Sequence, residues 1–207
     1  MRRLILDTTS NWCSLCLSDG ADIRDFRHVD LGRGHAERLI PLIAELPEGG
    51  QCDSIVVSRG PGSFTGVRIG ISAARALSLA WGVPVSGYGA LDALSAAARS
   101  MHSSVANASH VVIIPGGHGE YFAQSYGTLG LTLSPAGSFL PDDAITLFQE
   151  SIFVGAAAKE FVALRGFGTA IAIDADARNA MFLGPDAFTP DMQPDYVRGA
   201  DAKPNAS

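Results

Sequence analysis

The chain contains 207 residues, 47% of them hydrophobic and 17% charged, and its formal net charge at pH 7 is -6. Such a chain can bury a substantial core, either as one large domain or as two small lobes. Its acidic balance argues against a broad autonomous nucleic-acid surface, which needs clustered Lys and Arg, and no apolar run reaches the roughly eighteen residues of a membrane span. We therefore expect a cytoplasmic protein that does not bind a membrane.

The first half of the chain reads as three antiparallel strands followed by alternating helices and strands. The expected elements are strands 3–6, 12–17 and 23–29, helix 35–46, strand 54–58, helix 64–81, strand 84–87 and helix 90–100. Strands that alternate with helices favour parallel pairing in the second part of the sheet. Pro41 lies inside the first of these helices, so it must sit near the first turn or bend the helix.

The second half repeats a weaker, strand-rich pattern after a polar stretch of small residues over 101–109, which marks a linker. The expected elements are strands 110–114, 120–126, 131–138, 151–154 and 170–173, with helices 142–149 and 156–164. We predict an N-terminal lobe over 1–104 and a smaller, trimmed C-terminal lobe over 105–189. Part of the tail, 190–207, is expected to pack back on the first lobe.

Cys13 and Cys16 have a C-x-x-C spacing that is also found in redox and zinc sites. They lie on a predicted strand, where positions three apart point to opposite faces, so they can neither form a disulfide nor share a metal. We interpret them as buried structural cysteines. The five histidines show no ligand spacing, and Gly-x-Ser-x-Gly does not occur, so no metal or catalytic residues are predicted.

The glycine-rich segment 60–70 joins a predicted buried strand to a predicted helix, a place where phosphates are often bound. A P-loop is excluded because no Gly-Lys-Ser/Thr follows, and a dinucleotide fingerprint is weak because the next strand ends in Ser86-Gly87-Tyr88, without an acidic residue. The residues of the loop and of the start of the helix are Gly60, Pro61, Gly62, Ser63, Thr65, Gly66 and Gly70.

Small residues recur every four positions along this helix, at Gly62, Gly66, Gly70, Ala74 and Ser78. Glycine inside a helix costs about 1 kcal/mol relative to alanine, and close approach of another backbone is the usual compensation. We therefore favour a helix built for close contact, with another helix as its neighbour, over a phosphate loop.

The turn Asp7-Thr8-Thr9 between the first two strands is where actin-like and sugar-kinase-like folds hold nucleotide phosphates. Such turns normally contain a glycine so that backbone amides reach the phosphate, and this one has none. Asp7 could orient a metal-bound water there, but a carboxylate that caps a turn is commoner. We interpret the turn as a vestigial phosphate site.

Four segments closely resemble the bacterial TsaB family, formerly YeaZ. They are Arg59-Gly-Pro-Gly-Ser-Phe-Thr-Gly-Val-Arg-Ile-Gly70, Leu6-Asp-Thr-Thr9, His35-Ala-Glu-Arg-Leu-Ile-Pro-Leu-Ile43 and Pro194-Asp-Tyr-Val-Arg198. The resemblance is dense over the first hundred residues. It implies an α/β, two-lobed, actin-like ATPase fold (ASKHA, ribonuclease H-like) with mixed sheets and flanking helices.

The resemblance also implies a non-catalytic scaffold subunit of the complex that transfers a threonylcarbamoyl group to the tRNA adenosine 3′ of the anticodon. The implied partners are the catalytic subunit TsaD, the ATPase TsaE and, in isolation, a second copy of the chain, with tRNA contacted only indirectly. No cofactor of its own is implied, and ATP or ADP would bind only at an interface with partner subunits. In the catalytic relative a His-x-x-x-His metal pair follows the fifth strand, whereas segment 88–94 here has no histidine.

In this family the first two helices form the surface that pairs with a second copy or with the catalytic subunit. On that basis we nominate as partner-contact residues His35, Leu39, Leu42, Ile43, Val67, Ile71, Ala74 and Ser78. One departure from the family pattern is Pro115-Gly116-Gly117-His118, which stands where relatives carry an Asp-Ala-Arg-like segment. The alternative functions are an ATP-using phosphotransferase or a glycoprotease-like peptidase of the same fold, and more weakly a dinucleotide-binding module.

Overall fold

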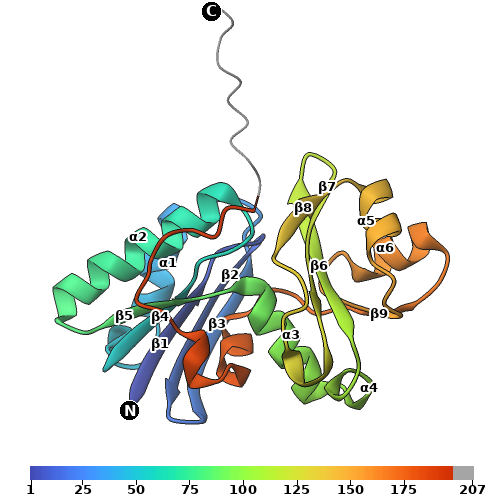
Figure 1. Cartoon of the computed structure of the whole chain (residues 1–207). Coiled ribbons are helices and arrows are strands. Elements are labelled where there is room, and N and C mark those ends of the chain that lie inside the picture. Colours follow the sequence, from blue (N-terminus) through green and yellow to red (C-terminus); the bar gives the residue numbers. More distant parts are fainter. Residues whose placement is uncertain (198–207) are drawn as a thin grey trace, which may run out of the picture.

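Two five-stranded mixed sheets lie side by side and are joined by a central helix (Figure 1). The computed structural model describes residues 1–197, and Arg198 with the rest of the predicted tail lies outside the described residues. No helix within 1–197 is long and apolar enough to cross a membrane.

The first sheet has the strand order β3-β2-β1-β4-β5. Its strands are β1 (Arg2–Asp7), β2 (Trp12–Asp19), β3 (Asp22–Asp30), β4 (Ser54–Ser58) and β5 (Val85–Tyr88). The first three pair antiparallel, and β1, β4 and β5 pair parallel, as the order of predicted elements indicates. Leu4, Ile5 and Leu6 are all buried because elements cover both faces of the sheet at β1.

Helices α1 (His35–Ala44) and α2 (Phe64–Trp81) cover one face of this sheet, with the short turn η1 (Pro47–Gly50) after α1. Helix α2 has the predicted bounds: the Ser63 hydroxyl caps its start by accepting from the Gly66 amide, and Gly82, with φ of 68°, ends it. Helix α1 ends two residues earlier than predicted and contains Pro41 in its interior rather than in its first turn.

Helix α3 (Ala90–Met101) lies between the two sheets. Its Leu91 and Leu94 belong to the core of the second sheet, whereas Ala93 packs on the first. Helix η3 (Ala177–Phe182) lies beside α3 and covers the same face of the first sheet. The predicted linker over 101–109 contains a short helix, α4 (Ser103–Ala106).

The second sheet has the order β10-β9-β6-β7-β8 and repeats the topology of the first. Its strands are β6 (His110–Gly117), β7 (Glu120–Tyr126), β8 (Gly137–Phe139), β9 (Ile152–Val154) and β10 (Thr169–Ile171). Helices α5 (Pro141–Leu147) and α6 (Ala158–Arg165) pack on the face opposite α3. The prediction of one strand over 131–138 is wrong for most of its length. After the 3-10 turn η2 (Thr128–Gly130) the chain is irregular, and within the predicted segment only the residues of β8 pair with β7 as a strand.

The chain returns to the first lobe at η3, earlier than the predicted lobe boundary at 189, because η3 packs on the first sheet; the turn η4 (Pro185–Ala187) follows. Thr189 pairs with Gly87 at the edge of β5, and the Asp195 amide donates to the Arg59 carbonyl at 2.8 Å. Met192 is buried in the core beneath α1 and α2. We call residues 189–196 the strap, because they bind the end of the described chain to the outside of the first lobe.

Candidate functional site

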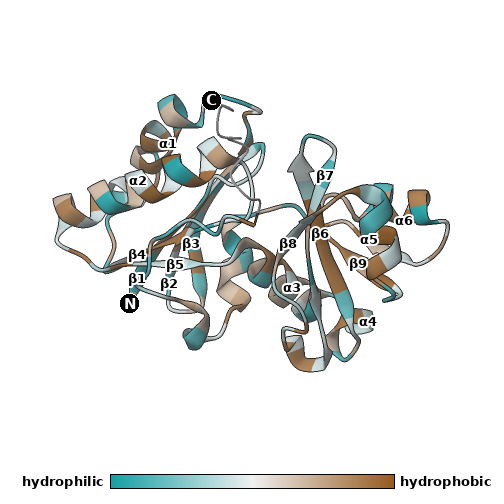
Figure 2. Cartoon of the chain, turned by 45° about the horizontal axis from the view of Figure 1, so that its top comes forward, coloured by the Kyte–Doolittle hydropathy of each residue, from teal (hydrophilic) through white to brown (hydrophobic). Residues whose placement is uncertain are grey.

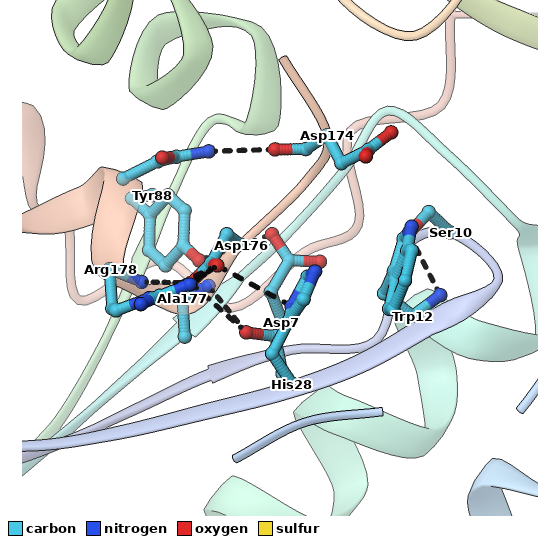
Figure 3. Close-up of polar contacts among 11 residues, drawn as sticks. Asp7, Ser10, Trp12, His28, Tyr88, Asp174, Asp176, Ala177 and Arg178 are labelled. Carbon is cyan, nitrogen blue, oxygen red and sulfur yellow. Dashed lines mark hydrogen bonds and ion pairs between the residues drawn. The ribbon is translucent and has the colours of Figure 1, made fainter. Parts of the chain in front are cut away.

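A buried polar cluster lies where β1 and β5 end, on the side that faces the second lobe (Figure 3). One oxygen of Asp7 accepts from the Thr9 amide at 2.9 Å and from the Thr9 hydroxyl at 2.7 Å. The other accepts from the Tyr88 hydroxyl at 3.2 Å, and the side chain is only 3% exposed. Ligands of open sheets usually bind at the carboxyl ends of parallel strands. Here both oxygens of the Asp7 carboxylate already accept hydrogen bonds from Thr9 and Tyr88 of the same chain.

Burial raises the pKa of Asp7, although its hydrogen bonds with Thr9 and Tyr88 oppose the shift. Burial and the neighbouring Asp7 also raise the pKa of Tyr88 well above its usual value. The turn Asp7-Thr8-Thr9 is therefore closed by its own hydrogen bonds, with the carboxylate as the cap of the turn. Across residues 1–197 there is no group of three or more His, Cys, Asp or Glu side chains that could hold a metal ion.

We expect Asp7→Asn to raise the free energy of unfolding at pH 7 relative to the wild type. Because the pKa of Asp7 is raised on folding, the folded chain binds this proton more tightly than the unfolded chain, in which the carboxyl has a pKa of about 3.9. The stabilising contribution is fully present below that value and is lost as the pH rises through the folded pKa. The advantage of the neutral amide should shrink on acidification, as measured by urea unfolding from pH 7 to pH 4. A variant that is less stable at every pH by the same amount contradicts this reading.

Asp176 forms a second cluster that the sequence analysis missed, because it joins segments about 160 residues apart. Its carboxylate accepts from the Arg178 amide at 2.8 Å and from the Ser14 hydroxyl at 3.2 Å, and the Ser14 hydroxyl accepts from the Ala177 amide. His28 lies 3.4 Å from the same carboxylate. Burial alone would raise the pKa of Asp176, but the bonds from Arg178 hold it below its usual value. The cluster attaches η3 to the first sheet, and no signal in the local sequence marks it.

The small residues at the start of α2 face the turn of the same chain. The Ser63 amide donates to the Thr9 carbonyl at 2.7 Å, and the Thr8 hydroxyl donates to the Gly66 carbonyl at 2.7 Å. A Cβ atom at Gly62 or Gly66 would overlap the backbone of this turn. The close contact we expected is present, but the expectation that a second helix provides it is wrong.

The nominated partner-contact residues are also placed differently from our expectation. Seven of the eight are buried in the first lobe's own core, namely His35, Leu39, Leu42, Ile43, Val67, Ile71 and Ala74. Ser78 is partly buried and donates to the Val83 carbonyl, which closes the end of α2. The seven buried residues are therefore core positions of the first lobe rather than an exposed partner surface, although Leu39 also lines a groove between α1 and α2.

An open, mainly apolar groove runs between α1 and α2 on their outer side. Figure 2 shows the ribbons of these two helices coloured by hydropathy, with the top of the molecule turned forward. Its volume is about 480 Å³, and it is lined by Ala36, Leu39, Ile40, Thr65, Arg68, Ile69, Ser72 and Ala73. Ile40 is 48% exposed, and Leu79, further along α2, is 87% exposed. Six of the groove residues belong to the segments that resemble the family, namely Ala36, Leu39, Ile40, Thr65, Arg68 and Ile69, whereas Gly60 and Pro61 lie in the loop before α2.

Two further features of the sequence fall outside these sites. Cys13 and Cys16 are free and lie on opposite faces of β2, as predicted, and burial raises the pKa of both thiols to about 11. Segment 115–118 forms the end of β6 and the hairpin turn to β7, with His118 in the left-handed region at φ of 52°.

A buried serine and histidine pair was also missed by the sequence analysis. The Ser95 hydroxyl lies 2.8 Å from His110 Nε2, and His110 Nδ1 lies 3.1 Å from the Ala108 carbonyl. Burial lowers the pKa of His110, which favours the neutral ring. Both side chains are enclosed between α3 and β6, so the pair joins the central helix to the second sheet rather than presenting a nucleophile.

Comparisons with known proteins agree with this architecture. The family model described as tRNA N6-adenosine threonylcarbamoyltransferase, TsaD, matches residues 30–173. The tRNA threonylcarbamoyladenosine biosynthesis protein TsaB of Haemophilus influenzae is 35% identical over 106 residues, which is 49% of this chain and 44% of that protein. The protein of the same name from Bacillus subtilis is 27% identical over 198 residues, 84% of this chain and 83% of that one. The chain thus spans less than half the length of the Haemophilus relative.

Solved structures show the fold. YeaZ from Pseudomonas aeruginosa has a TM-score of 0.70 at 23% identity and covers 87% of this chain and 89% of its own. The ethanolamine utilization protein EutJ from Carboxydothermus hydrogenoformans has a TM-score of 0.52 at 10% identity and covers 88% of each chain. The predicted actin-like, two-lobed α/β fold with mixed sheets is confirmed.

Proposed function

The chain belongs to the TsaB (YeaZ) family, within the group that the TsaD-type family model describes, and we propose that it is a non-catalytic scaffold subunit for tRNA threonylcarbamoyladenosine biosynthesis. The proposed partner is the catalytic threonylcarbamoyltransferase subunit, TsaD, bound over the groove between α1 and α2. In the absence of that subunit, a second copy of the chain is the proposed occupant.

The exposed apolar groove is the observation that carries this proposal. Isolated exposed apolar residues are ordinary, but Ile40, Ile69 and Ala73 line one continuous depression between two helices. Paired helices with an apolar groove between them can accept two helices of a partner, as in other helix-packed interfaces. Leu79 extends the apolar surface beyond the groove along α2.

The enclosed state of the Asp7 turn supports a non-catalytic role. A phosphotransferase needs a carboxylate and backbone amides that reach a nucleotide and its metal, whereas Asp7 here binds Thr9 and Tyr88. Any ATP or ADP is proposed to bind at an interface with the partner subunits, among which we include the ATPase subunit TsaE. Contact with tRNA is proposed to be indirect.

Reconstitution tests the proposal. The catalytic subunit and the ATPase subunit are incubated with tRNA, ATP and a threonylcarbamoyl donor, with and without this chain, and modified adenosine is measured by mass spectrometry of nucleosides. We expect modification to require the chain, and the chain alone to bind Mg-ATP too weakly for detection by titration calorimetry. Full modification without the chain would refute the scaffold role, and ATP turnover by the isolated chain would favour the phosphotransferase alternative.

A further inference from the structure

Arg68 stands at the rim of the α1–α2 groove and is held there by two aromatic rings. Its guanidinium carbon lies 3.4 Å from the centre of the Phe64 ring and 5.4 Å from that of Tyr196. Its Nε donates to the Tyr196 hydroxyl at 2.8 Å. The side chain is thus fixed by α2 itself and by the strap, so little of its conformational entropy remains to be lost on binding.

Arg68 is also the one charged residue among those that line the groove. None of the ion pairs formed within residues 1–197 includes it. Its contacts use the face of the guanidinium and Nε, which leaves the two terminal nitrogens for a further acceptor. A planar guanidinium with this edge open suits a carboxylate that accepts two parallel hydrogen bonds.

A partner that covers the groove must take this charge out of water. Burying an unpaired charge is strongly unfavourable, so an entirely apolar partner surface would lose much of what the contact with Ile40, Ile69 and Ala73 contributes. A carboxylate opposite Arg68 removes that penalty and selects partners that carry it. A second copy, the occupant proposed when the catalytic subunit is absent, offers no carboxylate in its groove lining, so a twofold contact buries two guanidinium groups and is the weaker of the two contacts.

We propose that Arg68 is the specificity-determining residue of the groove, and that the partner is a different protein whose apolar helical surface carries a carboxylate facing Arg68. This inference rests on the proposed function, because it concerns the chemistry of the surface that binds over the groove. Tyr196 acts as a positioning residue: through its hydroxyl the strap keeps the guanidinium at the rim.

The test measures the dissociation constant for the catalytic subunit at low and high salt. Arg68→Met keeps the length of the side chain and the apolar contacts but removes the charge, and we expect it to weaken binding about 30-fold or more. Arg75→Met is the matched control, since Arg75 lies two turns further along α2, outside the groove lining, and donates to the Met192 carbonyl. We expect it to change binding by less than about threefold.

Two further variants separate charge from positioning. Arg68→Lys keeps the charge but lacks the planar guanidinium that donates two parallel hydrogen bonds. We expect its affinity for the catalytic subunit to lie between those of the wild type and of Arg68→Met. Tyr196→Phe keeps the ring but removes the hydroxyl bond to Nε, so we expect a loss of several-fold that is absent in the Arg68→Met background. Thermal unfolding of every variant checks that the first lobe remains folded.

Equal or tighter binding by Arg68→Met overturns the inference while leaving the proposed function intact, because the wild type would still bind. Failure of the wild type to bind the catalytic subunit refutes the proposed function itself, and with it this inference. If Arg68→Met weakens self-association in sedimentation but not binding of the catalytic subunit, the occupant is a second copy and the proposed partner is wrong.

Discussion

Replacing Ala73 with Arg should weaken binding of the catalytic subunit by about 100-fold or more while leaving the fold intact. Ala73 lines the groove and is partly exposed, so a long charged side chain there can reach water in the free chain but must be buried or displaced in the complex. The readouts are the dissociation constant for the catalytic subunit and the yield of modified adenosine in the reconstituted reaction.

Ile71→Arg should behave in the opposite way, although it lies only two residues away. Ile71 is 4% exposed and belongs to the core between α2 and the first sheet. A guanidinium there would be buried among the apolar residues of this core, and we expect it to destabilise the chain by about 4 kcal/mol or more, a large part of the stability of a typical domain. Urea unfolding or the loss of soluble protein would measure this effect.

Ala163→Arg is the matched control for both substitutions, because Ala163 is an exposed alanine on α6 of the second lobe. We expect it to change neither stability nor partner binding. If Ile71→Arg folds normally and only pairing is lost, the α2 faces have been assigned the wrong way round. If Ala73→Arg binds as the wild type does, the groove is not the docking surface.

Gly66→Ala is expected to destabilise the chain by about 2 kcal/mol or more, although alanine favours helices by about 1 kcal/mol over glycine. An added Cβ atom at Gly66 would overlap the Thr8 carbonyl oxygen, so the start of α2 or the turn after β1 would have to move. Movement there also disturbs the hydrogen bond from the Thr8 hydroxyl to the Gly66 carbonyl. Chemical unfolding of the purified variant measures the loss.

Gly184→Ala provides the comparison, since a Cβ atom at Gly184 meets no atom within 4 Å and the backbone has an ordinary φ of -70°. Its stability should stay within about 0.5 kcal/mol of the wild type. Equal effects at the two glycines would mean that backbone flexibility, rather than close contact with Thr8, decides the outcome at Gly66.

Local patterns were sufficient to predict the elements of the first lobe. The predicted bounds of α2 match the observed ones because its apolar residues recur at helical spacing up to Gly82, which Pro84 follows. The parallel pairing of β4 with β5 follows from the helix α2 between them. The second lobe was harder, since the apolar alternation over 131–138 resembles a strand although only its last residues pair with β7.

The sequence by itself determined which residues share a face of α2, because a period of 3.6 residues groups positions regardless of what they contact. Only the tertiary structure decided which face meets water. Val67, Ile71 and Ala74 pack on the sheet, and the small residues meet Thr8, 58 positions away from Gly66. The groove side of the helix is left to Arg68 and to the partly buried Ile69 and Ala73. The contacts of Asp176 with Ser14 and of Tyr196 with Arg68 could not be predicted from the sequence for the same reason. They join distant segments and depend on how the chain returns to the first lobe, which local periodicity does not indicate.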